Sequence, residues 1–327
     1  MKKIFLSMAV VLALVACSSD KSLFQKARLA ASKGNFVKAI ELYTRAIKQN
    51  PQNFAAVLNR GVLWERLPVK NSRERQKNRR NAEQDYLRAT QINPYSAEAY
   101  NNLGALYIDT GRYLDAVYQL NDALNLQPKY FTARMNRAIA YYRLGNVQAA
   151  LTDFNRAAVQ RPKDPLLLLN RALAFYDMGQ YESAVKDLSY SITYNPNDAR
   201  AYLERARAFI KMGYPSNAYA DLEKAVSIQP TYALAYYYMG DLMFRKGETD
   251  LALGLVTRSK ELANQYVPAY ELMGDMLAVQ DPVAATTNYM VALKLDPANA
   301  ARYNAKMRAM KSEKGRERVQ ASRFYPR

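Results

Sequence analysis

Residues 100–128 read YNNLGALYIDTGRYLDAVYQLNDALNLQP, and this stretch recurs along the chain at intervals of 34 residues. Its small residues Gly111, Ala116 and Ala123 and its closing Pro128 return at the same spacing. The shifted copies contain Gly145, Ala150, Ala157 and Pro162, then Gly179, Ala184, Ser191 and Pro196, then Gly213, Ala218, Ala225 and Pro230. A fixed period of this length predicts one unit repeated many times, each copy packed on its neighbours.

This repeated pattern resembles the tetratricopeptide repeat, a helix–turn–helix unit. The resemblance covers residues 20–297 and eight copies, of which the last has Asp281 in its turn where most others have glycine. It implies an all-α fold, a right-handed α-solenoid of about eight helix–turn–helix repeats with a C-terminal capping helix. Such a resemblance indicates an architecture of stacked helix pairs and does not by itself indicate an activity.

Two repeat positions are occupied by small residues in every copy. The position on the second helix is alanine throughout, and the one on the first helix is glycine or alanine. These residues are Ala39, Ala82, Ala116, Ala150, Ala184, Ala218, Ala252 and Ala285, and Ala27, Gly61, Gly104, Ala138, Ala172, Ala206, Gly240 and Gly274. Small side chains allow two helices to cross closely, so we expect both positions to serve the fold.

Four repeats share an arginine at position 7 and an aspartate at position 23, and the other four repeats lack both. The pairs are Arg60 and Asp85, Arg137 and Asp153, Arg171 and Asp187, and Arg205 and Asp221. This co-occurrence predicts a structural ion pair that joins the two helices of a repeat. Acid–base carboxylates are the alternative interpretation of these aspartates.

The N-terminal residues predict export and lipid anchoring. Two lysines precede an apolar run that ends at Cys17, the only cysteine of the chain. The run is short for a transmembrane span and is typical of a signal peptide. Leu14 to Cys17 resembles a bacterial lipobox, which implies that residues 1–16 are removed, that Cys17 is acylated, and that 17–19 form a short tether. Ser18 after the cysteine favours the outer membrane, facing the periplasm.

Two basic segments carry most of the net charge of +18. Residues 66–80 contain seven basic residues and one glutamate, and residues 302–327 contain nine basic residues and two glutamates. The first coincides with an insertion at about 67–81 in repeat 2, with a basic patch of Arg73, Arg75, Lys77, Arg79 and Arg80. A capping helix is expected at 298–313 and a disordered basic tail at 314–327. These segments could contact anionic lipid, peptidoglycan acids or an acidic partner, or could simply be solvated.

The resemblance also indicates which side chains face the inner groove of the array. In tetratricopeptide arrays these are positions 2, 5, 6, 9, 12 and 13 of each first helix, called the groove positions below. Position 6 is asparagine in repeats 2 to 5, and apolar residues occupy other groove positions. The predicted protein-binding groove consists of Asn59, Asn102, Asn136, Asn170, Leu58, Met135, Ile139, Tyr142, Leu169, Leu173, Tyr176 and Tyr237.

This row of asparagines resembles the asparagine ladder of the glycosyltransferase that adds N-acetylglucosamine to serine and threonine. An amide donates and accepts at once, so spaced amides can hold an extended peptide without reading its side chains. The apolar groove residues would add most of the affinity. The alternative is that some of these side chains pack between repeats. An acidic chain terminus near Arg207, Lys211 and Arg245 is a further possibility.

Signatures of enzymes are missing from the sequence. The chain has no histidine, so the most frequent general base and zinc ligand is absent. It contains no glycine-rich phosphate loop, no metal-ligand cluster and no Ser/His/Asp set. We therefore expect no enzyme activity, no cofactor and no metal, and the export signal argues against nucleic acid as a partner.

The leading hypothesis is a lipid-anchored scaffold that binds envelope proteins through its groove and assists assembly or recruitment of an envelope complex. Lipoproteins of similar layout include pilotins, which help secretins assemble, and adaptors that recruit peptidoglycan hydrolases. The alternative is a protein that binds the cell wall or an anionic membrane surface through the basic insertion and tail.

Overall fold

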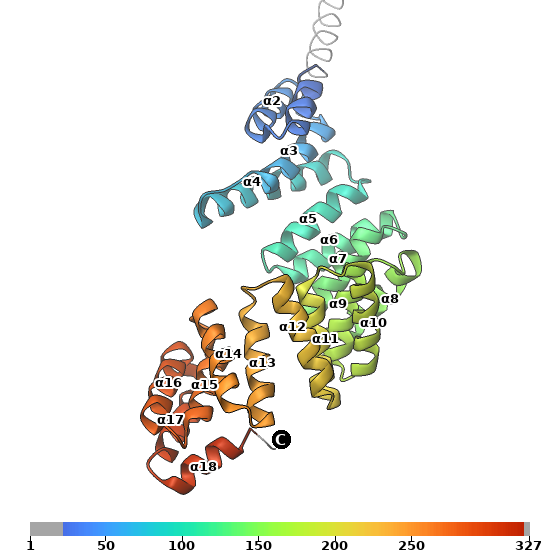
Figure 1. Cartoon of the computed structure of the whole chain (residues 1–327). Helices are drawn as coiled ribbons and strands as arrows, with labels where there is room; N and C mark the ends of the chain where they lie inside the picture. Colours follow the sequence, from blue (N-terminus) through green and yellow to red (C-terminus); the bar gives the residue numbers. More distant parts are fainter. Residues whose placement is uncertain (1–21, 324–327) are drawn as a thin grey trace, which may run out of the picture. The chain divides into compact units, whose positions relative to one another are not determined.

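The computed structural model of the protein describes residues 22–323, and the predicted signal peptide, Cys17 and the tether lie outside them. Within the described residues the regular structure is entirely helical, with no strand. The chain divides between Pro162 and Lys163 into two compact units. In each unit, helices follow one another as hairpins packed side by side, so the predicted all-α repeat architecture is confirmed (Figure 1).

The first unit contains the hairpins of repeats 1 to 4. It begins with a helix over residues 22–32. The first helices of the next three repeats are α3 (Phe54–Arg66), α5 (Ala97–Asp109) and α7 (Phe131–Arg143). The second helices are α2 (Phe36–Gln49), α4 (Ser72–Ile92), α6 (Tyr113–Leu126) and α8 (Val147–Gln160).

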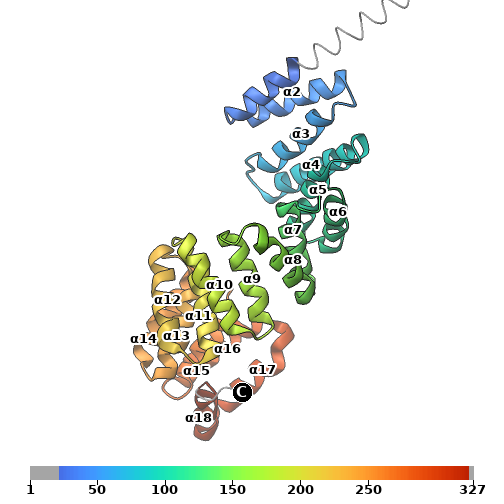
Figure 2. The ribbon, with the colours of Figure 1, turned by 90° about the vertical axis from the view of Figure 1, so that its right-hand side faces the viewer.

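The second unit contains repeats 5 to 8 and the C-terminal helices, seen from a second side in Figure 2. Its first helices are α9 (Pro165–Asp177), α11 (Ala199–Met212), α13 (Ala233–Lys246) and α15 (Val267–Leu277). Its second helices are α10 (Tyr181–Tyr194), α12 (Pro215–Ile228), α14 (Thr249–Leu262) and α16 (Pro282–Leu295). The 3-10 turn η1 (Pro297–Asn299), α17 (Ala300–Ala309) and α18 (Glu313–Ala321) follow.

The boundaries of the helices follow from local chemistry. Gly111 between α5 and α6 has a φ of 78°, a left-handed conformation in which a side chain is strained, and five other turn glycines share it. Asn146 begins α8 by accepting the backbone N–H of Ala149 at 3.2 Å. Proline follows one residue after the C-cap of most second helices, where it prevents the helix from continuing.

The two small-residue positions lie where the helices of a hairpin cross. The eight alanines of the second helices are completely buried. A Cβ added at Gly61 would lie 2.6 Å from the ring of Tyr86 on the partner helix, and one added at Gly104 would lie 2.6 Å from Leu120. The absence of a side chain at these glycines therefore leaves room for a large residue on the second helix.

The insertion in repeat 2 lengthens a helix. α4 has 21 residues, whereas the other second helices have 14. The side chain of Asn71 accepts the backbone N–H of Glu74 at 2.9 Å, and the Glu74 carboxylate accepts the N–H of Lys70 at 2.9 Å. This reciprocal capping begins the helix early, at Ser72, so that its first turns extend beyond the end of a standard hairpin.

The C-terminal segment differs from the prediction. We expected one capping helix at 298–313 and a disordered tail from 314, whereas the described part of this segment forms α17 and α18, and α18 packs against both α15 and α17. Met310 is buried, and Met307 and Val319 pack against the same apolar cluster. The prediction of disorder was wrong because basic residues of this segment form ion pairs with buried carboxylates, which are described below.

Candidate functional site

An amide row in the first unit is the most suggestive arrangement at the groove positions. Asn136 on α7 donates to the side-chain oxygen of Asn101 on α5 at 3.0 Å, and Asn101 donates to the side-chain oxygen of Asn102 at 3.3 Å. The Nδ2 group of Asn102 and the Oδ1 atom of Asn136 take no part in these bonds, and both side chains are partly exposed. One donor and one acceptor are therefore available on neighbouring repeats, as a peptide unit requires.

The four predicted asparagines do not form one continuous ladder. Asn59 donates to the carbonyl oxygen of Ala55 at 2.7 Å, and Asn170 donates to that of Leu166 at 2.8 Å, so each bonds its own helix. Asn170 also belongs to the second unit. Only Asn102 and Asn136 are linked, and the link is Asn101, which sequence analysis missed. Asn101 is a polar residue at position 5, which is apolar in several other repeats. This difference could have identified Asn101 from the sequence.

Three of the predicted apolar groove residues are buried. Leu58, Met135 and Leu169 are 5%, 6% and 1% exposed, respectively. All three occupy position 5, and Leu58 and Leu169 belong to the apolar cores of their units. Their prediction as exposed groove residues was wrong because these three side chains pack into the interior, whereas Tyr237, also at position 5, is partly exposed. The remaining five, Ile139, Tyr142, Leu173, Tyr176 and Tyr237, are partly exposed.

Two tyrosines at groove positions of α13 and one tyrosine before α15 form edge-to-face contacts in the second unit. The ring of Tyr237 lies 5.2 Å from that of Tyr238 and 5.3 Å from that of Tyr266. Burial, with a contribution from Asp241, raises the pKa of Tyr237 to about 12, so the phenol stays neutral. Neutral tyrosines present a flat apolar ring and a hydrogen-bonding hydroxyl, which is a combination enriched in protein interfaces.

Arg207 lies at a groove position of α11 between an acid and an aromatic ring. Its guanidinium lies 4.8 Å from the ring centroid of Tyr176 and donates to the carboxylate of Glu204 at 2.5 Å. Because Glu204 already neutralises it, Arg207 is poorly suited to bind the carboxylate of an acidic chain terminus. Arg245 is likewise paired, with Asp241 at 2.8 Å.

The C-terminal segment supplies cations to carboxylates at the groove positions of α13 and α15. Asp275, which is completely buried, accepts Lys306 at 2.6 Å, Arg323 at 2.8 Å and the hydroxyl of Tyr289 at 2.8 Å. Glu271 lies 2.7 Å from Lys306. Burial alone would raise the pKa of Glu271, but this lysine and its neighbouring arginines outweigh burial and lower the pKa. Basic residues therefore anchor the segment to the last repeats.

All four predicted arginine–aspartate pairs are present and are bidentate. Arg137 donates to Asp153 at 2.7 and 2.9 Å, and the same geometry recurs at Arg60, Arg171 and Arg205. The third nitrogen of Arg137 donates to Asn121 on the preceding repeat at 2.7 Å. The pair thus also joins one repeat to the next, which the sequence analysis did not anticipate. These aspartates are buried and fully engaged, which favours a structural role over acid–base chemistry.

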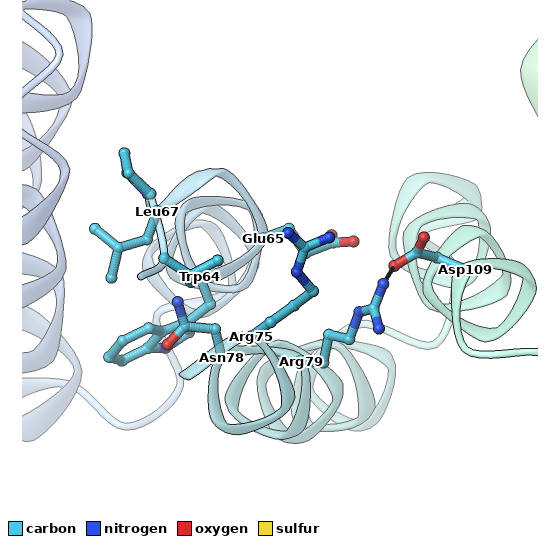
Figure 3. A pocket seen from close by; sticks show the side chains of 9 residues that line it. Trp64, Glu65, Leu67, Arg75, Asn78, Arg79 and Asp109 are labelled. Carbon is cyan, nitrogen blue, oxygen red and sulfur yellow. Dashed lines mark hydrogen bonds and ion pairs between the residues drawn. The ribbon is translucent and has the colours of Figure 1, made fainter. Parts of the chain in front are cut away.

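The insertion creates a pocket of about 470 Å³ in the first unit (Figure 3). Its walls come from the end of α3, the connection to α4, the first turns of α4 and the end of α5. Arg75 and Arg79 extend from α4 into the space between α3 and α5. Arg79 pairs with Asp109, so this part of the predicted basic patch is neutralised within the protein.

The rest of the basic patch is exposed on α4. Arg73, Lys77 and Arg80 line a second pocket, of about 530 Å³, together with Glu74. None of these three cations forms an ion pair within residues 22–323. The described part of the chain contains no cluster of three or more side chains suited to a metal ion. It also contains no helix with the length and apolar character needed to cross a membrane.

The fold and the repeat positions agree with family comparisons. Models described as tetratricopeptide repeat match residues 24–68, 85–118, 106–165 and 199–232, and a model described as TPR repeat matches 172–213. Together these matches cover more than half of the chain. A curated relative, the probable UDP-N-acetylglucosamine–peptide N-acetylglucosaminyltransferase SPINDLY of Solanum lycopersicum, is 25% identical over 114 residues. The match covers 35% of this chain and only 11% of that protein.

Solved structures support the fold. A tetratricopeptide repeat protein from Parabacteroides merdae ATCC 43184 is 24% identical, with a TM-score of 0.60, over 78% of this chain and 98% of that chain. PilF of Pseudomonas aeruginosa is 20% identical, with a TM-score of 0.56, over 62% of this chain and 92% of that chain. Proteins built from this repeat are scaffolds for protein–protein interaction and are in general not enzymes. The chain belongs to the tetratricopeptide repeat family.

Proposed function

We propose that the protein is a lipid-anchored adaptor that holds an extended segment of another envelope protein along its groove positions. The observation that supports this most is the amide row of Asn101, Asn102 and Asn136. Its internal hydrogen bonds fix the amides of Asn102 and Asn136. Among residues 22–323 they leave one donor and one acceptor without a partner on adjacent repeats. A peptide backbone in extended conformation offers the complementary pair.

The amide contacts alone would bind weakly. Each hydrogen bond contributes about 0.5–1.5 kcal/mol net, so two bonds account for millimolar affinity at best. Ile139 and Tyr142 lie on the same helix as Asn136 and are partly exposed, so they offer apolar area beside it. Burying such side chains against a partner would supply the larger part of the free energy of binding.

The anchor and the location are parts of the same proposal. The apolar run before Cys17 and the unique cysteine support acylation, and acylation would keep the groove near the membrane surface, at the outer membrane on the periplasmic side. Changing Cys17 to serine should move the protein from the membrane fraction to the soluble fraction. Membrane retention of this variant would contradict the lipid anchor.

Site-specific photocrosslinking in cells tests the groove directly. A photoreactive residue in place of Tyr142 should crosslink the native anchored protein to one or a few envelope proteins. The matched control is Tyr118, a tyrosine that is 67% exposed on α6, a second helix, and it should give no such product. Equal crosslinking at both positions would show that the contact is nonspecific and would contradict the groove proposal.

A second function, binding to the cell wall or to anionic lipid, is favoured by one observation. Arg73, Lys77 and Arg80 are exposed on α4, and they form no ion pair with any residue of the described part of the chain. The basic C-terminal segment supports this second function less well, because Arg323 already forms an ion pair with Asp275. Neutralising the three residues of α4 should reduce sedimentation with anionic vesicles or with sacculi if this function holds. Unchanged sedimentation would show that these three side chains are solvated and bind neither surface.

A further inference from the structure

The pocket in Figure 3 exists because of the insertion in repeat 2. Turns in most other repeats are closed by a left-handed glycine, and there the second helix starts within a few residues. In repeat 2 the connection between α3 and α4 is longer, and α4 begins early under the cap of Asn71. Arg75, Asn78 and Arg79 lie at i, i+3 and i+4, so one face of the added turns points at the end of α3.

Four charged side chains line the pocket, and three of them have a partner in the protein. Arg79 pairs with Asp109, and Glu65 accepts a hydrogen bond from the hydroxyl of Tyr86. Burial raises the pKa of Glu65, and the hydrogen bond from Tyr86 opposes this shift. The side chain of Arg75 makes no hydrogen bond or ion pair within residues 22–323. Among the described residues, the pocket therefore presents one guanidinium without a hydrogen-bond or ion-pair partner.

A buried amide lies beside this guanidinium. Asn78 is only 8% exposed, lines the pocket, and its side chain has no hydrogen-bond partner within the described residues. Its amide atoms are not among the fully buried polar atoms that lack a partner, so they keep some contact with solvent and are available to a ligand. Trp64 and Val69 supply apolar walls to the same space. A ligand with a short apolar stem and a terminal anion would satisfy all of these groups.

The pocket adjoins groove positions of the first unit. Glu65 occupies position 12 of α3 and Asp109 occupies position 13 of α5, and both line the pocket. These are the helices that carry Asn59 and Asn102. A segment lying along those asparagines would thus have side chains within reach of the space beside Arg75.

We propose that this pocket selects an acidic side chain, glutamate or aspartate, on the segment that the groove holds. The carboxylate is bound by Arg75 and Asn78, and its methylene groups lie against Trp64. This inference rests on the proposed function and narrows it to partners with an acidic residue at one position. The seven basic residues of 66–80 add a positive field that favours the same choice.

Binding of degenerate peptides tests the proposal. The probes are three libraries of extended octapeptides that carry glutamate, glutamine or lysine at a central position and random residues elsewhere. They are measured against the full-length detergent-solubilised protein and against Arg75→Ala. The matched control is Arg80→Ala, which removes the same charge from the same helix outside the pocket. The side chains of Arg75 and Arg80 are exposed, so neither substitution should affect folding.

We expect the wild type and Arg80→Ala to prefer the glutamate library, and Arg75→Ala to bind it about tenfold more weakly while keeping its affinity for the glutamine library. Equal losses in the two variants, or no preference for glutamate in the wild type, would overturn the proposal. Arg75-dependent binding of N-acetylmuramic acid in place of the acidic peptides would also overturn it and identify a wall-sugar site. If no library binds the wild type, the proposed groove function itself fails.

Discussion

Replacing Asp153 by asparagine tests the role of the arginine–aspartate pairs most severely. Asp153 is 2% exposed and accepts two hydrogen bonds from Arg137, at 2.7 and 2.9 Å, and one from Arg134, at 3.3 Å. The side chains of the two arginines are 18% and 10% exposed. Asparagine keeps the shape of the site but removes the negative charge, so both cations remain buried without a counterion.

The expected cost follows from this burial. Removing one partner of a buried ion pair destabilises a protein by about 3–5 kcal/mol. Limited water access to Arg137, together with the bonds that the asparagine oxygen can still accept, reduces this to about 2–4 kcal/mol. The control is Glu41→Gln, which removes a carboxylate from an ion pair with Lys38 whose side chains are 53% and 50% exposed. That pair should contribute nothing measurable.

Urea unfolding followed by circular dichroism, combined with hydrogen exchange, measures the effect. An array need not unfold in one step, so exchange in α7 and α8 is the local readout. Asp153→Asn should lower the unfolding midpoint and accelerate exchange in these helices. A midpoint and exchange pattern equal to those of Glu41→Gln would refute the structural interpretation of the pairs and reopen a functional role for the aspartate.

Three further predictions concern packing, pH and the C-terminal segment. Gly61→Ala should destabilise by about 1–2 kcal/mol, because its Cβ would lie 2.6 Å from the ring of Tyr86, whereas Gly254→Ala, with open space around it, should stabilise by up to about 1 kcal/mol in the same urea assay. The pKa of Glu271 in the folded protein lies below 4.5, so its contribution to stability is present above pH 4.5 and is lost as the pH falls below that value. Glu271→Gln should therefore flatten the acid limb of a profile of stability against pH. Arg323→Ala should accelerate hydrogen exchange in α18 and leave exchange in α14 unchanged. Equal exchange of α18 in the wild type and in Arg323→Ala would show that Arg323 does not anchor the segment.

Repeated features of the fold could be predicted from the sequence because each is local and occurs several times. The turn glycines, the buried alanines and the four ion pairs follow from spacing alone. The early start of α4 followed from the Asn71 cap, which needs only adjacent residues. The order of the C-terminal segment could not be predicted, because it depends on Asp275, which is far from Arg323 in sequence.

The candidate site was predictable only in part. Position 6 identified Asn102 and Asn136, but their link through Asn101 depends on side-chain rotamers that spacing does not determine. The burial of Leu58, Met135 and Leu169 was not predicted. A repeat position indicates which way a side chain points, but not how much of that side chain is exposed to solvent. The pocket beside Arg75 required the packing of three helices, and a basic run in a sequence does not distinguish paired from unpaired charges.

Affinity for the captured segment tests the central claim most directly. The segment that crosslinks to a photoreactive residue at position 142 would be synthesised as a peptide and titrated against the full-length protein. The double variant Asn102→Ala, Asn136→Ala should raise its Kd about tenfold or more, because two hydrogen bonds to the peptide are lost. The control Asn125→Ala, an exposed asparagine of α6, should leave the Kd unchanged. An unchanged Kd in the double variant, with folding intact, would contradict the claim that these amides hold the partner.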